Sequence, residues 1–280
     1  MKAFRSLKGE VAVVTGAASG IGRALAQRLA RDGVALAIAD KDQAGLAETA
    51  KLLASSGVAV STHVFDVTDA ARLARFPAEV LDRHGRVSIL INNAGVAILG
   101  TVEQLSLDDY EWLINVNFWG VVRSVKHFLP HLKKEPRAAI VNLSSIFGII
   151  APPGQSAYCA SKFAVRGFTE SLRHELHGKP ILIMSVHPGG IRTPIALNAR
   201  IGAGVDPAVA PSMVAAFDKL APTSPMAAAD RIVRGILRGE TRVLIGADAK
   251  QLDWIQRNFP ERYWRIIGPL MTRRAGRPLV

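Results

Sequence analysis

The chain has 280 residues, of which 49% are apolar and 21% charged, as is typical of a folded globular protein. This length allows one large α/β domain with a sizeable core, or two small domains. The single cysteine, Cys159, excludes an internal disulfide and a cysteine-rich metal site, and favours a reducing compartment. Because no leader is apparent and no apolar run approaches the roughly 20 residues of a membrane helix, we expect a soluble, cytoplasmic protein.

The charge balance is strongly basic, with 35 lysines and arginines against 23 acidic residues and a net charge of +12. Such a charge can attract nucleic acid, an anionic membrane surface or acidic ligands. Most of the basic residues are scattered, and only the C-terminal end concentrates arginines, at Arg262, Arg265, Arg273, Arg274 and Arg277. The scatter favours a solvated basic surface over a nucleic-acid interface.

The first predicted elements are a strand over residues 11–14, a glycine-rich turn and a helix. The turn reads Thr15-Gly16-Ala17-Ala18-Ser19-Gly20-Ile21-Gly22, and the helical spacing of Ile21, Leu25 and Leu29 stops at Asp32-Gly33. Glycines allow the backbone to approach a ligand, and the helix N-terminus offers free N–H groups to a phosphate. The spacing G-x-x-x-G-x-G differs from the common G-x-G-x-x-G, but the strand and helix around it favour a dinucleotide site.

The next apolar run, residues 34–40, predicts a buried strand that ends in Asp40. Asp40 follows Gly22 at close to the distance at which an acid meets the adenosine ribose in doubly wound folds. A carboxylate there accepts from both ribose hydroxyls and repels a 2′-phosphate, which favours NAD over NADP. Lys41 leaves NADP open, because a cation at this point can pair with the extra phosphate.

The remaining chain continues to alternate between helix and strand. Helices are predicted over residues 43–56, 70–84, 106–132 (with Ser106 as N-cap), 157–176 and 227–239, and strands over 58–65, 87–92, 138–143, 181–186 and 242–246. Alternation with nearly continuous apolar strands predicts a doubly wound, Rossmann-type α/β fold, a parallel sheet of about seven strands with helices on both faces. With no linker or repeat, we expect a single domain over residues 1–280.

The stretch from Ser145 to Lys162 places a phenol and an ammonium four residues apart, at Tyr158 and Lys162. On a helix this spacing puts both groups on one face, about 5–6 Å apart at Cβ. A neighbouring cation favours the phenolate and lowers the phenol pKa, so the pair predicts a tuned acid/base. Ser145 lies just after a predicted strand, where its hydroxyl can bind the same substrate oxygen.

Over roughly residues 8–250 the chain resembles the short-chain dehydrogenase/reductase family. The resemblance rests on several motifs that occur in the order expected for this family. The motifs are Thr15 to Gly22, Asp66-Val67, Asn92-Asn93-Ala94-Gly95, Val116-Asn117, Ser145, Tyr158-x-x-x-Lys162, and Pro188-Gly189 with Thr193. The resemblance implies an NAD(P)-dependent oxidoreductase acting on CH–OH or C=O groups. It also implies four catalytic residues, Asn117, Ser145, Tyr158 and Lys162.

The resemblance implies roles for each motif. Tyr158 exchanges a proton with the substrate, Lys162 lowers its pKa and binds the nicotinamide ribose, Ser145 orients the substrate, and Asn117 holds a water in a proton relay. Ser144 points the opposite way. The implied cofactor contacts are Gly16, Ser19, Gly20, Ile21, Gly22, Asp40, Asp66, Val67, Asn93, Ala94, Gly95, Tyr158, Lys162, Pro188, Gly189, Ile191 and Thr193. Asn93 is also expected to fix the sheet.

No metal site is predicted. His127 and His131 are four residues apart on the long helix, where a surface or subunit contact is favoured over zinc. His187, beside Pro188-Gly189, is equally consistent with packing and with contact to substrate. Cys159 adjoins Tyr158 but points about 100° away around the helix, so a buried inert thiol is favoured.

Residues 188–225 lose the alternation and contain many Gly, Pro and Ala residues, which predicts a functional lid. In the family this segment resembles the substrate loop, and its apolar residues are Ile195, Leu197, Ile201, Met213 and Phe217. With Phe147, Ile149 and Ile150 they suggest an apolar alcohol or ketone. Phe147, Ile149, His187 and Ile195 are the candidate substrate contacts.

The C-terminal extension, residues 250–280, interleaves aromatic residues with arginines. It could form an amphipathic segment on a membrane surface, but we favour a segment folded over the pocket or over a neighbouring subunit. The family resemblance also implies a homo-oligomer, a tetramer or dimer, with Phe118, Trp119 and Phe163 facing neighbours.

The predicted activity is hydride transfer between NAD(H) and an apolar secondary alcohol or ketone. Alternatives are an NADPH-dependent carbonyl reductase and a dinucleotide-binding protein without catalysis.

Overall fold

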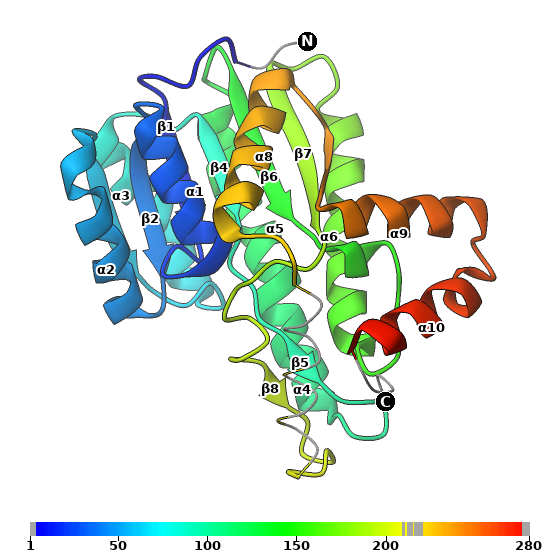
Figure 1. The fold of residues 1–280 in the computed structure, drawn as a ribbon. Coiled ribbons are helices and arrows are strands. Elements are labelled where there is room, and N and C mark those ends of the chain that lie inside the picture. Colours follow the sequence, from blue (N-terminus) through cyan, green and yellow to red (C-terminus); the bar gives the residue numbers. More distant parts are fainter. Residues whose placement is uncertain (1–3, 209–210, 212–214, 216–220, 276–280) are drawn as a thin grey trace.

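The computed structural model describes residues 4–275 except 209–210, 212–214 and 216–220. Its centre is a seven-stranded parallel sheet with the strand order β3-β2-β1-β4-β6-β7-β9 (Figure 1). The strands are β1 (Val11–Thr15), β2 (Ala35–Asp40), β3 (Val60–Val64), β4 (Ile89–Asn92), β6 (Ala138–Leu143), β7 (Ile181–Pro188) and β9 (Arg242–Ile245). This sheet confirms the predicted Rossmann-type fold, and its strand order reverses between β1 and β4.

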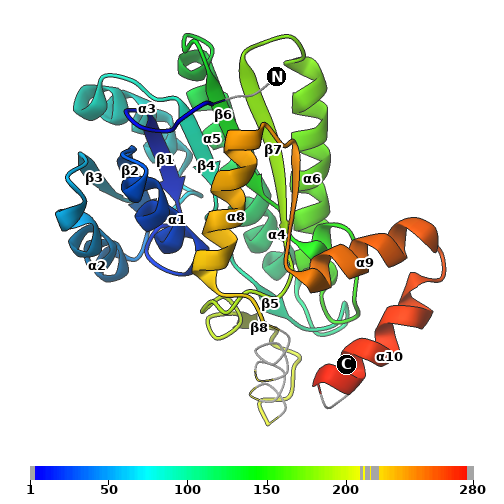
Figure 2. The same cartoon turned by 45° about the horizontal axis from the view of Figure 1, so that its top comes forward.

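Helices cover both faces of the sheet (Figures 1 and 2). One face packs against α1 (Gly20–Arg31), α2 (Gln43–Leu53) and α8 (Pro225–Arg238), and the other against α3 (Ala70–His84), α5 (Gly120–Leu132) and α6 (Ser156–Glu175). Successive side chains of a strand point to opposite faces, so Ala12 and Val14 join the first core while Val13 joins the second. Burial on both faces explains why the strands are almost continuously apolar.

The helix starts follow the capping residues in the sequence. Asp42 and Asp69 accept hydrogen bonds from the first turns of α2 and α3. Ser106 forms a capping box with Asp109 at the start of α4 (Leu107–Ile114), as its predicted N-cap role requires. These caps satisfy backbone N–H groups that a helix leaves unpaired.

The predicted helix over residues 106–132 is not regular. It consists of α4, a π-helical segment at Asn115–Trp119, and α5. Apolar periodicity did not reveal this segment, because one wide turn shifts the register of a helix without interrupting it. The π-helical segment contains Asn117, so it changes the setting of a predicted catalytic residue.

Between β7 and α8 the chain is largely irregular, but β8 (Arg200–Ile201) pairs in parallel with β5 (Ile98–Leu99). After β9 the chain forms α9 (Ala247–Asn258) and α10 (Tyr263–Ala275), which project together from the side of the sheet (Figures 1 and 2). We call α9 and α10 the C-terminal hairpin. Among the described residues, no helix is long and apolar enough to cross a membrane.

Candidate active site

A cavity of about 670 Å³ lies at the carboxyl ends of the sheet strands. It includes the crevice where the strand order reverses, which is where doubly wound folds bind ligands. Most of the predicted site residues line it: Gly16, Ser19, Gly20, Ile21, Asp40, Asp66, Val67, Asn93, Ala94, Gly95, Ser145, Phe147, Tyr158, Lys162, Pro188, Gly189, Ile191, Thr193 and Ile195. Four do not, namely Gly22, Asn117, Ile149 and His187.

The glycine-rich turn lies tightly against the segment after β4. A Cβ at Gly16, where φ is +69°, would lie 2.7 Å from the Cα of Ala94, and one at Gly22 would lie 2.0 Å from the Gly16 carbonyl oxygen. Both distances are far inside van der Waals contact, so no side chain fits. Gly22 therefore shapes the turn and is not among the residues that line the cavity, and its predicted cofactor contact stays a prediction.

Asn93 holds this turn to the sheet. Its side-chain amide donates to the carbonyl oxygens of Thr15 and Gly16, at 3.0 Å each, and its backbone N–H donates to the Thr15 hydroxyl at 3.1 Å. The predicted role of Asn93 in fixing the sheet is confirmed. The first turn of α1 is thereby aimed into the cavity, with the positive end of its dipole toward the ligand.

Asp40 lies at the end of β2 with both carboxylate oxygens engaged by backbone. They accept hydrogen bonds from Ala18 N–H at 2.9 Å and Asp42 N–H at 3.0 Å. The side chain of Lys41 pairs with Asp66, with Nζ 3.6 Å from a carboxylate oxygen. Lys41, whose charge left NADP open as the cofactor, is therefore already paired with a carboxylate.

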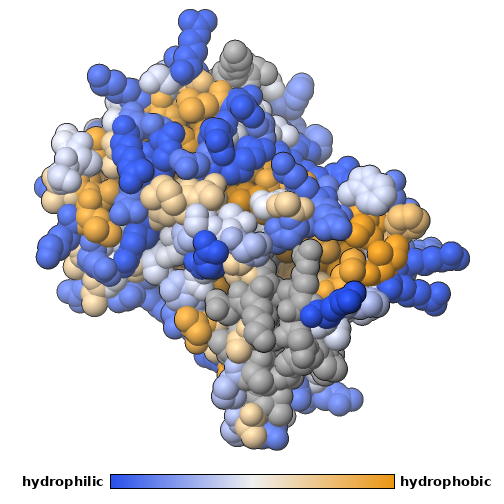
Figure 3. Space-filling view, in the orientation of Figure 1, coloured by the Kyte–Doolittle hydropathy of each residue, from blue (hydrophilic) through white to orange (hydrophobic). Residues whose placement is uncertain are grey.

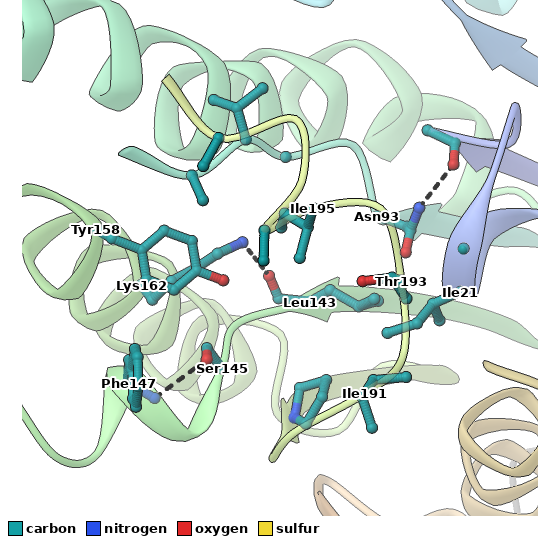
Figure 4. A pocket seen from close by; sticks show the side chains of 18 of the residues that line it. Ile21, Asn93, Leu143, Ser145, Phe147, Tyr158, Lys162, Ile191, Thr193 and Ile195 are labelled. Atoms are coloured by element: carbon teal, nitrogen blue, oxygen red, sulfur yellow. Dashed lines mark hydrogen bonds between the residues drawn. The ribbon is translucent and has the colours of Figure 1, made fainter. Parts of the chain in front are cut away.

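Ser145, Tyr158 and Lys162 meet on the opposite side of the cavity, as Figure 4 shows. Tyr158 and Lys162 come from the first turns of α6, and Lys162 Nζ lies 5.7 Å from the centre of the phenol ring. Lys162 Nζ also donates to the carbonyl oxygen of Leu143, at 3.1 Å, where β6 ends. Ser144 instead donates to the Lys162 backbone carbonyl at 2.8 Å, pointing away from the cavity as predicted.

Burial governs the protonation of this pair. It raises the pKa of Tyr158 to about 12, which a hydrogen bond with Ser145 partly offsets, and it lowers the pKa of Lys162 to about 8. In this structure burial dominates the shift of the Tyr158 pKa, and the Lys162 ammonium is directed to the Leu143 carbonyl. That Lys162 lowers the tyrosine pKa stays a prediction.

Asn117 is fully buried and acts as a junction. Its amide donates to the Val96 carbonyl and to the Ser161 hydroxyl, both at 3.0 Å, and its carbonyl oxygen accepts from Val96 N–H at 2.8 Å. A Cβ at Gly95 would lie 3.3 Å from this oxygen and 3.4 Å from Lys162 Nζ. Asn117 thus joins the π-helical segment, the end of β4 and α6 close to the lysine.

His187 lies beneath Ser145 and not in the cavity. It is fully buried, with Nδ1 3.1 Å from the Ser145 carbonyl oxygen and Nε2 2.9 Å from the Ser185 hydroxyl. Because a carbonyl only accepts, Nδ1 carries the proton and Nε2 accepts from Ser185. Burial lowers the pKa of His187 to about 4, which keeps the ring neutral. The predicted substrate contact is thus replaced by support of Ser145.

Ile149 and Cys159 are also buried away from the cavity. Ile149 packs with Ile255, Ile267 and Met271 of the C-terminal hairpin, because its side chain faces the hairpin and not the substrate space. Cys159 is buried as predicted, and burial raises the pKa of its thiol to about 12, which agrees with an inert thiol.

The far wall of the cavity comes from residues that were not among the predicted site residues. The hairpin supplies Gln251, Leu252, Ile255, Ile267, Leu270 and Met271, and the opposite side includes Val96, Leu99, Trp112, Gln155 and Arg200. Leu252 and Ile255 are three residues apart on α9, and Ile267 and Met271 are four apart on α10. Such helical spacing predicts a buried face but not its partner. The favoured prediction, a C-terminal segment folded over the pocket, agrees with this wall.

The irregular segment after β7 closes the cavity near the glycine-rich turn. A Cβ at Gly20 would lie 3.1 Å from Cγ2 of Thr193, so the two segments approach closely. Ile195 lines the cavity and is 38% exposed. Met213 and Phe217, also expected in this loop, lie outside the described residues.

The residues present fit a dinucleotide. The turn from Gly16 to Gly20 keeps a backbone cradle that side chains would fill, the helix dipole favours a pyrophosphate, and Asp40 lines the end where a ribose is expected. Such a cavity, with a half-buried phenol and a buried lysine at its other end, defines an NAD(P)-dependent oxidoreductase.

Comparison with known proteins gives the family. A family model described as short chain dehydrogenase matches residues 10–202, and the chain belongs to this family. A Mycobacterium tuberculosis protein named as an oxidoreductase, SadH, is 44% identical over 265 residues, covering 94% of this chain and 95% of that protein.

Two solved structures show the shared fold. A short chain dehydrogenase/reductase from Burkholderia phymatum in complex with NAD has a TM-score of 0.84 at 30% identity, covering 92% of this chain and 96% of the other. An alcohol dehydrogenase from Thermococcus sibiricus complexed with 5-hydroxy-NADP has a TM-score of 0.71 at 29% identity, covering 85% and 94%.

Proposed function

We propose that this protein transfers hydride reversibly between NAD(H) and an apolar secondary alcohol or ketone, with Tyr158 as the general acid/base. The single observation behind the proposal is that Tyr158 and Ser145 meet at one cavity wall with Lys162 behind them. When bound, the nicotinamide would supply or accept the hydride. The protein residues then have to orient one oxygen and move one proton.

Each residue has a distinct task in this proposal. Ser145 holds the substrate oxygen, and Tyr158 gives it a proton during reduction or takes one during oxidation. The raised pKa of Tyr158 keeps the phenol protonated at neutral pH, which suits proton donation to a ketone. Lys162, held by Leu143 and near Asn117, would bind the nicotinamide ribose and return the proton through the water relay.

The preference for NAD rests on charge around Asp40. A 2′-phosphate beside this carboxylate would be repelled, and Lys41 is already paired with Asp66. Arg23, the next cation at this end, is paired with Glu48 at 2.7 Å. The proposal therefore expects higher turnover with NADH, and a clear NADPH preference would instead support an NADPH-dependent carbonyl reductase.

The apolar substrate class is inferred from the wall around the reacting groups. Phe147 and Ile195, proposed as substrate contacts, are joined by Leu252, Ile255 and Met271 of the hairpin. Side chains of this kind stabilise a ligand by removing apolar surface from water, at about 25 cal/mol per Å². We therefore expect affinity to rise with the apolar area of the alcohol.

The test of the mechanism is Tyr158→Phe, which removes only the phenol oxygen. Turnover should fall at least about a hundredfold, since general acid/base catalysis contributes 10²–10⁴-fold and no other phenol lines the cavity among the described residues. NADH binding, followed by fluorescence titration, should stay within about threefold because the proton acts on the substrate.

The matched control is Tyr110→Phe. The Tyr110 hydroxyl bonds to Ser156 at 2.5 Å, and its side chain does not line the cavity. Its turnover should remain close to that of the unchanged protein. Retained turnover in Tyr158→Phe would remove the proposed mechanism, and equal loss in both variants would indicate a structural effect.

We also propose a homo-oligomer in the cytoplasm. Trp119 and Phe163 are 46% and 40% exposed on neighbouring helical elements, and Phe118 lies beside Trp119 with ring centres 5.4 Å apart. Exposed aromatic residues of this kind are enriched at protein interfaces. Light scattering of the purified chain would give the number of subunits, and a monomer would contradict the proposal.

A further inference from the structure

Large apolar side chains are exposed on the C-terminal hairpin. Trp254, Phe259, Ile266 and Leu270 are 60%, 43%, 38% and 48% exposed, and we call these four residues the outer apolar face. The rings of Trp254 and Phe259 lie 6.4 Å apart, and Ile266 and Leu270 are one helical turn apart on α10. Single exposed apolar residues are ordinary, whereas a group on one element indicates a contact surface.

The inner side of the same hairpin is firmly packed. Ile255, Ile267 and Met271 are buried against Ile146 and the residues that follow it. The Tyr263 hydroxyl also accepts a hydrogen bond from the Ala151 N–H at 3.1 Å. The outer apolar face is therefore presented by an anchored element, and its residues have no place left in the core.

Positive charge surrounds the outer apolar face. Arg257, Arg262, Arg265 and Arg273 are exposed, and Glu261 is the single exposed acid among residues 254–273. Asp253 is buried and paired with Arg242 and Arg257. Aromatic and aliphatic residues flanked by arginines are the composition of helices that lie in an anionic lipid interface.

The cavity opens at this surface. Leu270 both lines the cavity and is half exposed, so it lies at the mouth. Figure 3 shows an apolar area between α9 and α10 that is bordered by hydrophilic residues. Leu270 thus connects the apolar wall of the cavity with the exposed surface of the hairpin.

We propose that the C-terminal hairpin docks on the surface of an anionic phospholipid bilayer, with the outer apolar face in the headgroup region and the cavity mouth toward the lipid. Charge complementarity decides for lipid over a second copy of this chain. A symmetric contact between two copies at this face would set Arg262, Arg265 and Arg273 against their own copies. An anionic bilayer attracts the same charge.

Docking is tested by flotation of the full chain with vesicles of phosphatidylcholine, alone or mixed with phosphatidylglycerol. This assay measures binding and does not depend on enzymatic turnover. We expect flotation with the anionic vesicles, weakening as salt is added, and little with the zwitterionic ones. The double variant Arg262→Glu/Arg265→Glu should weaken partitioning more than about tenfold, since each basic residue near the surface contributes roughly fivefold.

The apolar contribution is tested by Trp254→Ser/Phe259→Ser, two residues that do not line the cavity. We expect at least about a tenfold loss of partitioning. The matched control is Leu52→Ser/Leu107→Ser, which removes apolar side chains that are 48% and 81% exposed elsewhere, and should float like the unchanged chain. No flotation of the unchanged chain, or equal flotation of all variants, would overturn the proposal.

Light scattering in the absence of vesicles separates lipid from a second copy. A smaller assembly for the Trp254→Ser/Phe259→Ser variant, without flotation of the unchanged chain, would assign the outer apolar face to a subunit contact and overturn the proposal. An unchanged mass together with lost flotation supports lipid docking.

If the hairpin docks on lipid, an apolar substrate can enter the cavity directly from the bilayer. This part of the proposal rests on the proposed function, and it is tested by measuring turnover. Turnover of an apolar ketone dissolved in anionic vesicles should fall several-fold in Trp254→Ser/Phe259→Ser, while turnover of a water-soluble ketone stays unchanged. Equal loss with both ketones would overturn entry from the lipid. Because flotation needs no catalysis, a failure of docking and a failure of the proposed activity remain distinguishable.

Discussion

The cofactor half and the substrate half of the cavity are built in different ways. The cofactor half, residues 11–95, is shaped by backbone, with a glycine-rich turn pressed against the end of β4 and held by Asn93. The substrate half is shaped by apolar side chains of the loop after β7 and of the C-terminal hairpin. A close backbone fit tolerates almost no change, whereas an apolar wall can be repacked.

The difference shows in what one added methyl group would meet. At Gly22 it would lie 2.0 Å from a backbone oxygen that cannot move without displacing the turn. In the substrate half, Ile267 and Met271 contact other flexible side chains, which can adjust to a change of volume. We therefore expect different relatives to keep the first half and to vary the second.

The largest effect is expected from Gly22→Ala. The new methyl group forces the glycine-rich turn away from β4, so we expect a loss of about 3 kcal/mol or more in the free energy of unfolding. NADH affinity should fall at least about a hundredfold because the cradle no longer fits the pyrophosphate. Urea unfolding and fluorescence titration measure the two losses.

Gly167→Ala is the matched control for that variant. Gly167 is on α6, and a Cβ there meets nothing within 4 Å. Alanine in a helix interior is better than glycine by about 1 kcal/mol, so this variant should be slightly more stable and bind NADH normally. Normal NADH binding by Gly22→Ala would contradict the view that backbone fit shapes the cofactor half.

A smaller and more selective effect is expected from Ile267→Ala in the hairpin. Ile267 is fully buried and lines the cavity. Removing it costs about 2–4 kcal/mol of local packing, so KM for an apolar alcohol should rise about tenfold while NADH affinity is unchanged. Leu197→Ala, at a side chain that is 68% exposed, should change neither quantity.

Steady-state kinetics with NADH saturating would measure the Ile267→Ala effect. If NADH affinity falls together with substrate affinity, the two halves are coupled more tightly than their construction indicates. Separate losses would sharpen the contrast between a backbone cradle and a side-chain wall.

The smallest effect concerns Lys162, where the two halves meet. Its folded-state pKa of about 8 lies below the unfolded value of 10.5, so between these values the unfolded chain binds more protons. The cost of burying the ammonium is therefore complete below pH 8 and is relieved as pH rises. From pH 8 to 9.5 this amounts to about 2 kcal/mol, at roughly 1.4 kcal/mol per pH unit.

Urea unfolding of the unchanged chain and of Lys162→Met at several pH values isolates this contribution. The stability of the unchanged chain relative to Lys162→Met should increase between pH 8 and 9.5. Above pH 10 the raised pKa of Tyr158 acts in the opposite direction, because the folded state then binds more protons than the unfolded one. A constant difference from pH 8 to 9.5 would show that the lysine is not buried as an ammonium.

Much of the site was predictable because its signals are local. The order of strand, glycine-rich turn and helix, the acid at Asp40, and the spacing of Tyr158 and Lys162 all depend on residues close in sequence. Five predicted elements of the cofactor half match β1, α1, β2, α2 and α3 closely. The π-helical segment around Asn117 was not predicted, because a single wide turn does not change the apolar periodicity visibly.

The sequence by itself determined the Rossmann-type sheet and the cofactor cradle, because buried parallel strands and glycines without room for a Cβ leave a direct mark on residue type. Only the tertiary structure decided which partners the buried polar groups take. His187 supports the Ser145 carbonyl, and Lys162 donates to the Leu143 carbonyl. It also decided that the C-terminal hairpin forms a wall of the cavity, since an apolar helix face does not name the surface that it covers.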